Sequence, residues 1–96
     1  MCRNIKTLHH FQPPATEEEV RASALQYVRK LTGMASPSQA NQKAFNKAVD
    51  EITHLTLHLF DELEVHTPPR TREAEKAKAA ERGRKREEAL RARYAR

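Results

Sequence analysis

The feature that most constrains the fold is the uneven distribution of large apolar residues along the chain. They recur at helical spacing through the first two-thirds, whereas after Pro69 only Leu90 and Tyr94 remain. Side chains three or four positions apart share one face of a helix, so the first part should form amphipathic helices that pack together. We therefore predict an all-α protein, with a helical unit over residues 1–69 and a basic tail over residues 70–96.

The first helix is predicted over residues 16–32. Thr16 and Glu19 have the spacing of a capping box, and two further glutamates place negative charge in the first turn, where the helix dipole favours it. Gly33 suits a left-handed C-terminal stop. Residues 1–15 read as an extended arm that Pro13 and Pro14 separate from the helix. The predicted apolar stripe comprises Val20, Ala24, Tyr27, Val28 and Leu31.

A second helix is predicted over about residues 37–64. Three residues each match a helix-start preference: Ser36 as the cap, Pro37 at the first helical position and Gln39 at the third. The short connection favours an antiparallel helical hairpin, and Thr67-Pro68-Pro69 marks a break. The predicted apolar positions are Phe45, Ala48, Val49, Ile52, Leu55, Leu59, Phe60 and Leu63.

Two helices alone provide a small core for a chain of 96 residues. Leu55, Leu57, Leu59 and Phe60 also spread widely around the second helix, so one partner helix cannot cover them all. We expect self-association into a homodimeric four-helix bundle, which would bury this surplus. The alternative is that the arm and the tail fold back and cover it within a monomer.

The tail carries nearly all of the net charge. Residues 70–96 hold eleven Lys/Arg and five Glu, a net of +6, and the remaining seven Lys/Arg and eight Asp/Glu sum to −1. A basic strip binds RNA or DNA without reading sequence, because it neutralises phosphates and releases counterions. The alternatives are a solvated helix that keeps the protein soluble and an acidic protein partner. The predicted nucleic-acid-binding residues are Lys78, Arg82, Lys85, Arg86 and Arg93.

The tail is rich in strong helix formers but has no apolar face, so we predict a helix that stays frayed until a partner holds it. Glu81–Lys85 and Glu87–Arg91 have the favourable spacing for ion pairs along a helix.

Two groups of residues have the chemistry of metal ligands. Asp50, His54, His58 and Glu62 follow one another at four-residue spacing along one side of the second predicted helix. Two histidines four positions apart on a helix can reach one metal ion, and a carboxylate one turn away can join them. No recognised metal-binding motif accompanies the row, and it lies beside the apolar stripe, where a solvated polar face is the favoured interpretation.

The N-terminal arm holds the second group, Cys2, His9 and His10. A cysteine near the N-terminus can chelate a metal or act as a nucleophile if a base lies within reach. An ordinary role as arm residues is the alternative. No cofactor is predicted.

Other features narrow the class of protein. The longest apolar run is far too short for a membrane span, and the N-terminus lacks the apolar run of a secretory signal. A single cysteine fits a reducing compartment, so we expect a cytoplasmic protein. Since no catalytic motif is recognised, our hypothesis is a non-enzymatic binding protein whose tail contacts nucleic acid or a ribonucleoprotein. There are two alternatives. One is a metal- or thiol-dependent protein that uses Cys2 with His9 or His10, and the other is a structural interaction module.

Three stretches of the chain resemble a bacterial family, domain-of-unknown-function family 2277. They are MCRNIKTL at the start, FQPPATEEEVRASALQYVRKLTG and PSQANQKAFNKAVDEI. The resemblance covers roughly residues 1–63 and suggests a bacterial cytosolic source. It brings with it no assigned activity, cofactor or catalytic residue, but it draws attention to Cys2, Arg3 and Asn4.

Overall fold

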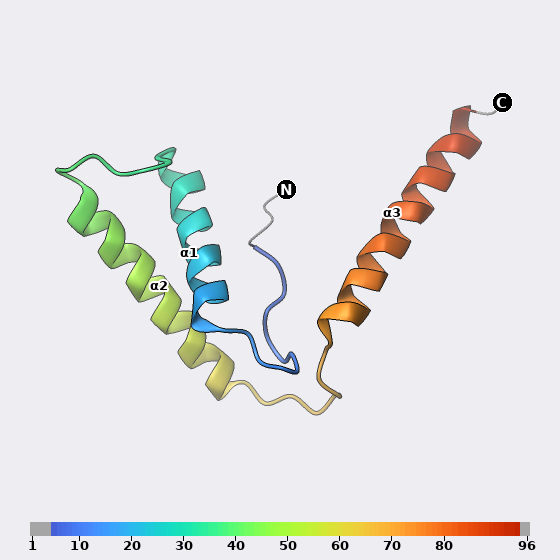
Figure 1. Ribbon diagram of the computed structural model, residues 1–96, viewed down its shortest axis with the longest axis horizontal. Helices are drawn as coiled ribbons and strands as arrows, with labels where there is room; N and C mark the ends of the chain where they lie inside the picture. The colour runs from blue at the N-terminus through green and yellow to red at the C-terminus, as the bar shows by residue number, and fades with distance from the viewer. Residues whose placement is uncertain (1–4, 95–96) are drawn as a thin grey trace.

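The computed structural model describes residues 5–94, and their arrangement confirms the all-α class. It contains the helices α1 (Glu17–Thr32), α2 (Gln42–Glu62) and α3 (Arg72–Tyr94). The first two lie side by side and run in opposite directions, while α3 points away from them (Figure 1). Within residues 5–94 the only β-type pairing is an isolated bridge between Phe11 of the arm and Arg70.

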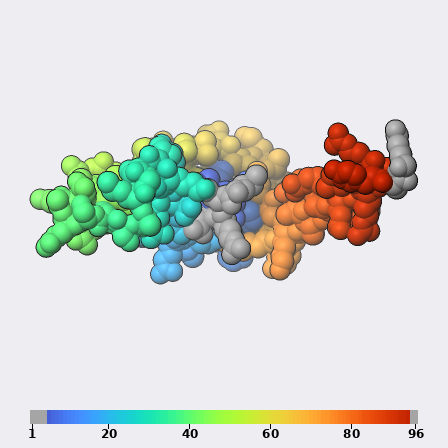
Figure 2. Space-filling model, turned by 90° about the horizontal axis from the view of Figure 1, so that it is seen from above, coloured from blue at the N-terminus to red at the C-terminus, as the bar shows by residue number. Residues whose placement is uncertain are grey.

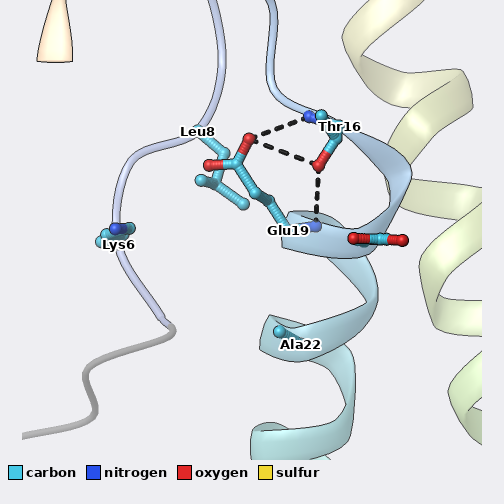
Figure 3. A pocket seen from close by; sticks show the side chains of 6 residues that line it. Lys6, Leu8, Thr16, Glu19 and Ala22 are labelled. Carbon is cyan, nitrogen blue, oxygen red and sulfur yellow. Dashed lines mark hydrogen bonds between the residues drawn. The ribbon is translucent and has the colours of Figure 1, made fainter.

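Helix α1 begins and ends where the sequence predicts. The Glu19 backbone N–H donates to the Thr16 hydroxyl at 3.2 Å, and the Thr16 N–H donates to the Glu19 carboxylate at 3.0 Å, which completes the capping box (Figure 3). At the other end Gly33 has a φ of 73°, and its N–H donates to the Arg29 carbonyl at 2.9 Å. A residue without a Cβ adopts this left-handed conformation at no steric cost.

Helix α2 begins at Gln42, five residues later than predicted, so the proposed start at Ser36–Pro37 is wrong. Its cap is Asn41, whose backbone N–H donates to the Ser38 carbonyl and whose side-chain amide donates to the Ser38 hydroxyl, both at 3.0 Å. These local bonds hold residues 38–41 in turns. No large apolar side chain occurs between Pro37 and Phe45, so an earlier helical turn would gain nothing from packing.

The core lies between α1 and α2 and is formed by small and medium side chains. Leu25, Ala48 and Ile52 pack against its edge. Thr53 is fully buried although the apolar pattern omitted it, and its hydroxyl donates to the Val49 carbonyl at 2.7 Å, which satisfies the hydrogen-bonding requirement of a buried hydroxyl. The central cluster comprises Ala24, Val28, Phe45 and Val49, with Val20 and Leu8 also buried.

The predicted apolar stripes are wider than the contact between the two helices. Four of the predicted apolar residues are each between 46% and 72% exposed: Tyr27 and Leu31 of α1, and Leu55 and Leu59 of α2. Leu63, just beyond α2, is 47% exposed. The hairpin therefore buries only part of the apolar surface that the sequence supplies.

The molecule is elongated, with extents of 57 × 36 × 17 Å. Seen from above, α3 occupies one end and the hairpin the other (Figure 2). Helix α3 has no buried residue. None of the helices in the described part of the chain is long and apolar enough to cross a membrane.

Candidate nucleic-acid interface

Helix α3 presents the predicted basic residues to solvent. The segment is helical from Arg72 to Tyr94, as its alanine, glutamate, lysine and arginine content favours. All five predicted nucleic-acid-binding side chains are exposed, and we call them the cationic strip: Lys78, Arg82, Lys85, Arg86 and Arg93.

The cationic strip occupies one side of α3. At 3.6 residues per turn its members fall within an arc of about 100°, and the strip extends about 22 Å along the helix axis. The three glutamates after residue 80 lie outside this arc. Glu75 lies inside it, one turn before Lys78, and is 3.6 Å from the Lys78 ammonium and 3.8 Å from the Arg70 guanidinium.

The other side of α3 carries ion pairs instead. Arg84 contacts Glu81 and lies 4.0 Å from Glu88, while Arg91 lies 3.0 Å from Glu87. The predicted Glu87–Arg91 pair is therefore present, whereas Glu81 pairs with Arg84 rather than with Lys85.

The cations of α3 fall into two groups, according to whether a carboxylate of the described chain already lies within salt-bridge distance. Arg84 and Arg91 already face carboxylates on their own helix. Among residues 5–94, no carboxylate lies within salt-bridge distance of Arg82, Lys85, Arg86 or Arg93. Four of the five strip residues therefore offer uncompensated positive charge to an external anion, and Lys78 is the exception because it faces Glu75.

The N-terminal arm pairs with the linker directly before α3. Arg70 donates its backbone N–H to the His10 carbonyl at 2.7 Å, and its own carbonyl accepts from the Gln12 N–H at 2.9 Å. The Arg70 guanidinium also donates to the His9 carbonyl at 2.8 Å, and His10 Nε2 donates to the Thr67 carbonyl at 2.6 Å. We call these contacts, together with those of Arg72 described next, the arm–linker clasp.

Arg72, the first residue of α3, completes the clasp. Its Nη1 donates to the Pro13 carbonyl at 2.7 Å, and its Nη2 lies 3.2 Å from Oε1 of Glu19 on α1. The guanidinium carbon also lies 5.3 Å from the centre of the Phe11 ring, within the range of a cation–π interaction. One side chain thus ties together the arm, α1 and α3.

Glu19 consequently serves both the helix cap and the clasp. The Thr16 N–H that donates to its carboxylate holds the Glu19 pKa below the usual value of 4.5, and Arg72 acts in the same direction against the opposing effect of burial. A shallow cavity of about 250 Å³ lies beside this cap, between Leu8 of the arm and Ala22 of α1 (Figure 3).

The clasp is not apparent from the residue pattern. The proline pairs Pro13-Pro14 and Pro68-Pro69 predict helix breaks, and proline also favours extended backbone that is able to pair. The predicted boundary between residues 69 and 70 falls inside the clasp, so Arg70 and Arg72 connect the tail to the N-terminal unit.

The predicted metal ligands on α2 have other neighbours. His54 Nε2 lies 3.7 Å from the Glu17 carboxylate, and Asp50 pairs with Arg21 of α1. His58 and Glu62 are exposed. No group of three or more histidine, cysteine, aspartate or glutamate side chains is placed to hold a metal ion anywhere in the stretch 5–94.

The histidines of the arm face an apolar recess. The His9 ring lies 5.1 Å from the Phe60 ring and 6.0 Å from the His10 ring. A cavity of about 440 Å³ adjoins them, lined also by Phe11, Leu57 and Asp61. Cys2, the third member of this predicted group, lies outside the described residues, as do Arg3 and Asn4.

The family of the chain follows from a comparison with family models. The model described as "Uncharacterized conserved protein (DUF2277)" matches residues 1–78, which is most of the 96-residue chain. The chain belongs to the DUF2277 family. No curated protein and no solved structure matches the chain.

The DUF2277 match extends beyond the stretches in which the resemblance was seen. It contains both sides of the arm–linker clasp and the beginning of α3. It ends at Lys78, so the other four residues of the cationic strip lie outside it.

Proposed function

We propose that this chain is a non-enzymatic binding protein whose α3 helix contacts the phosphate backbone of nucleic acid through the cationic strip. The observation that carries the proposal is the division of α3 into a side with internal ion pairs and a side on which four of the five strip cations, all except Lys78, have no carboxylate partner within residues 5–94. Only the latter can exchange its counterions for phosphates. Since most of the strip lies beyond residue 78, we propose this function for the present chain and not for the family as a whole.

The proposed contact is independent of base sequence. Tyr94 is the only aromatic residue on α3, so stacking on unpaired bases has little support. A duplex presents one negative charge for about every 1.7 Å of its axis, which provides ample phosphates for a strip about 22 Å long. Five phosphate contacts on duplex DNA predict a log–log slope of affinity against salt of about −4.5.

The test compares two variants of equal net charge. Lys85→Gln/Arg86→Gln removes two cations of the strip, and Arg84→Gln/Arg91→Gln removes two that face glutamates. Binding of a labelled duplex DNA, and of the matching RNA duplex, is measured by fluorescence anisotropy across a salt series. The strip variant should make the slope shallower by about 1.8 on DNA, since each lost contact contributes about 0.9, and the control variant should change it by less than about 0.5.

Substitution is preferable to truncation at Pro69, because truncation removes the clasp along with the strip. Equal effects of the two variants would refute the role of the strip, since net charge alone would then determine affinity. Absence of binding to either duplex at low salt would eliminate nucleic-acid contact altogether and leave a structural interaction module.

A further inference from the structure

One face of α2 carries an apolar row that the described chain leaves open. Leu55 is 72% exposed and Leu59 is 50% exposed, while Ile52 and Ala48 are only partly buried. Ala44, one turn earlier, is exposed, and Leu63 follows directly after the helix. We call this row the apolar seam: Ala44, Ala48, Ile52, Leu55, Leu59 and Leu63.

The seam has the pattern of a helix–helix interface. Its members are separated by three or four residues, and the five that lie within α2 share an arc of about 80°. Between Ala44 and Leu59, no polar residue falls within this arc. This is the spacing with which helices pack in bundles.

Neither the arm nor the tail covers the seam. The arm lies against the other side of α2, where Leu57 and Phe60 line the recess beside His9 and His10. Leu57 lies about 160° around the helix from Leu55. Helix α3 has no buried residue and does not pack on α2. In residues 5–94 the arm therefore covers only part of the surplus apolar surface, at Leu57 and Phe60, and leaves Leu55 and Leu59 open.

The exposed area exceeds what a compact chain of this size shows. The accessible surface is 8145 Å² for 11.0 kDa, against about 5600 Å² expected for a compact monomer of that mass. Part of the excess of about 2500 Å² belongs to the projecting α3. A stable interface requires about 800 Å² from each partner, which the exposed part of the hairpin, and not α3, would have to supply.

The order of residue sizes along the seam indicates a second copy of the same helix. The N-terminal half is small, with Ala44 and Ala48, and the C-terminal half is large, with Leu59 and Leu63. In an antiparallel pair related by a two-fold axis, Ala44 meets Leu63 and Ala48 meets Leu59, and Ile52 meets Leu55. A parallel pair would instead set leucine against leucine at one end and alanine against alanine at the other.

We propose that the chain forms a homodimer in which the apolar seams of two α2 helices pack antiparallel about a two-fold axis between Ile52 and Leu55. Each contact then occurs twice, as an isologous interface requires. The two hairpins form a four-helix bundle, and each protomer keeps its own α3 outside it. The proposal does not depend on whether α3 binds nucleic acid.

The first experiment measures the oligomeric state of the full chain by sedimentation equilibrium from about 1 to 100 µM. The wild type should approach twice its mass of 11.0 kDa. Leu55→Glu/Leu59→Glu should weaken the dimer by at least about 100-fold, with unchanged helix content by circular dichroism because both side chains are exposed in the monomer. His58→Glu adds a charge to the polar side of α2 and should leave the dimer intact.

A second experiment tests the register. Ala48→Leu alone should weaken the dimer, because it sets leucine against leucine, whereas Ala48→Leu/Leu59→Ala exchanges the two sizes and should restore it. A wild type that remains monomeric throughout the concentration range would overturn the proposal. A dimer that tolerates both glutamates, or that responds equally to the single and the exchanged variant, would also overturn it.

Discussion

Arg72 offers the sharpest test of how α3 is attached to the rest of the molecule. Replacing it with alanine removes a hydrogen bond to the Pro13 carbonyl at 2.7 Å, an ion pair with Glu19 at 3.2 Å and the contact with the Phe11 ring. The arm–linker clasp would then rely on the backbone bonds between residues 10–12 and Arg70 and on the side-chain bonds of Arg70 to His9 and of His10 to Thr67. We expect Arg72→Ala to loosen the clasp while the α1–α2 core stays folded.

The size of the effect follows from the exposure of these contacts. The Arg72 side chain is 40% exposed, so the charged hydrogen bond contributes about 1 kcal/mol. The ion pair and the cation–π contact add about 0.5 kcal/mol each at such a site. A loss of about 2 kcal/mol corresponds to roughly a 30-fold change in the opening equilibrium of the clasp.

Amide hydrogen exchange followed by NMR measures this opening directly. The reporters are the N–H of Arg70, bonded to the His10 carbonyl, and the N–H of Gln12, bonded to the Arg70 carbonyl. Their protection should fall by roughly 30-fold in Arg72→Ala, and that of Val49 in the core should not change. Arg84→Ala removes a surface ion pair elsewhere on α3 and serves as the control. Unchanged protection of both reporters in Arg72→Ala would refute the proposed attachment.

Two further predictions concern the stability of the hairpin. Phe45→Ala should lower the free energy of unfolding by about 3–5 kcal/mol in urea titrations, because Phe45 lies in the central cluster. Tyr94→Ala is the control: because Tyr94 is 80% exposed, its loss should change the free energy of unfolding by less than about 0.5 kcal/mol. Because the Glu19 pKa is lowered on folding, its stabilising contribution is fully present above the unfolded value of 4.5 and is lost as the pH falls through the folded value. Thermal unfolding of Glu19→Gln and of the wild type should therefore converge at low pH and differ at neutral pH; a difference that persists unchanged at low pH would contradict this assignment.

The local elements with strong end signals were predictable from sequence. Thr16 and Glu19 begin α1 and Gly33 ends it, because caps satisfy backbone groups through neighbours close in the chain. The start of α2 was not predictable in the same way. Ser36 and Pro37 have the right residue types, but the energy of a cap is small, and without an apolar residue before Phe45 the turns around Ser38 prevail.

The candidate site also has features that residue spacing predicts and features that only the packing shows. The cationic strip follows from residue spacing once α3 is helical, because the angular position of a side chain depends only on its number along the helix. The Glu87–Arg91 pair also follows from that spacing, whereas the spacing predicts Lys85 as the partner of Glu81 and the structure places Arg84 there. By contrast, Thr53 is a polar residue that is nevertheless fully buried. Its hydroxyl is satisfied by the Val49 carbonyl one turn earlier on the same helix, but only the packing of α1 against α2 shows that this position lies in the core.

The sequence alone thus determined the helical class, the limits of α1 and the separation of apolar and basic segments, all of which depend on residues within a few turns of one another. Only the tertiary structure brought Arg70 and Arg72 to the arm some sixty residues away. It also decided which side of α2 the hairpin buries and which side, the apolar seam, stays open. Both outcomes depend on how separate segments meet in space, and helical periodicity contains no information about that.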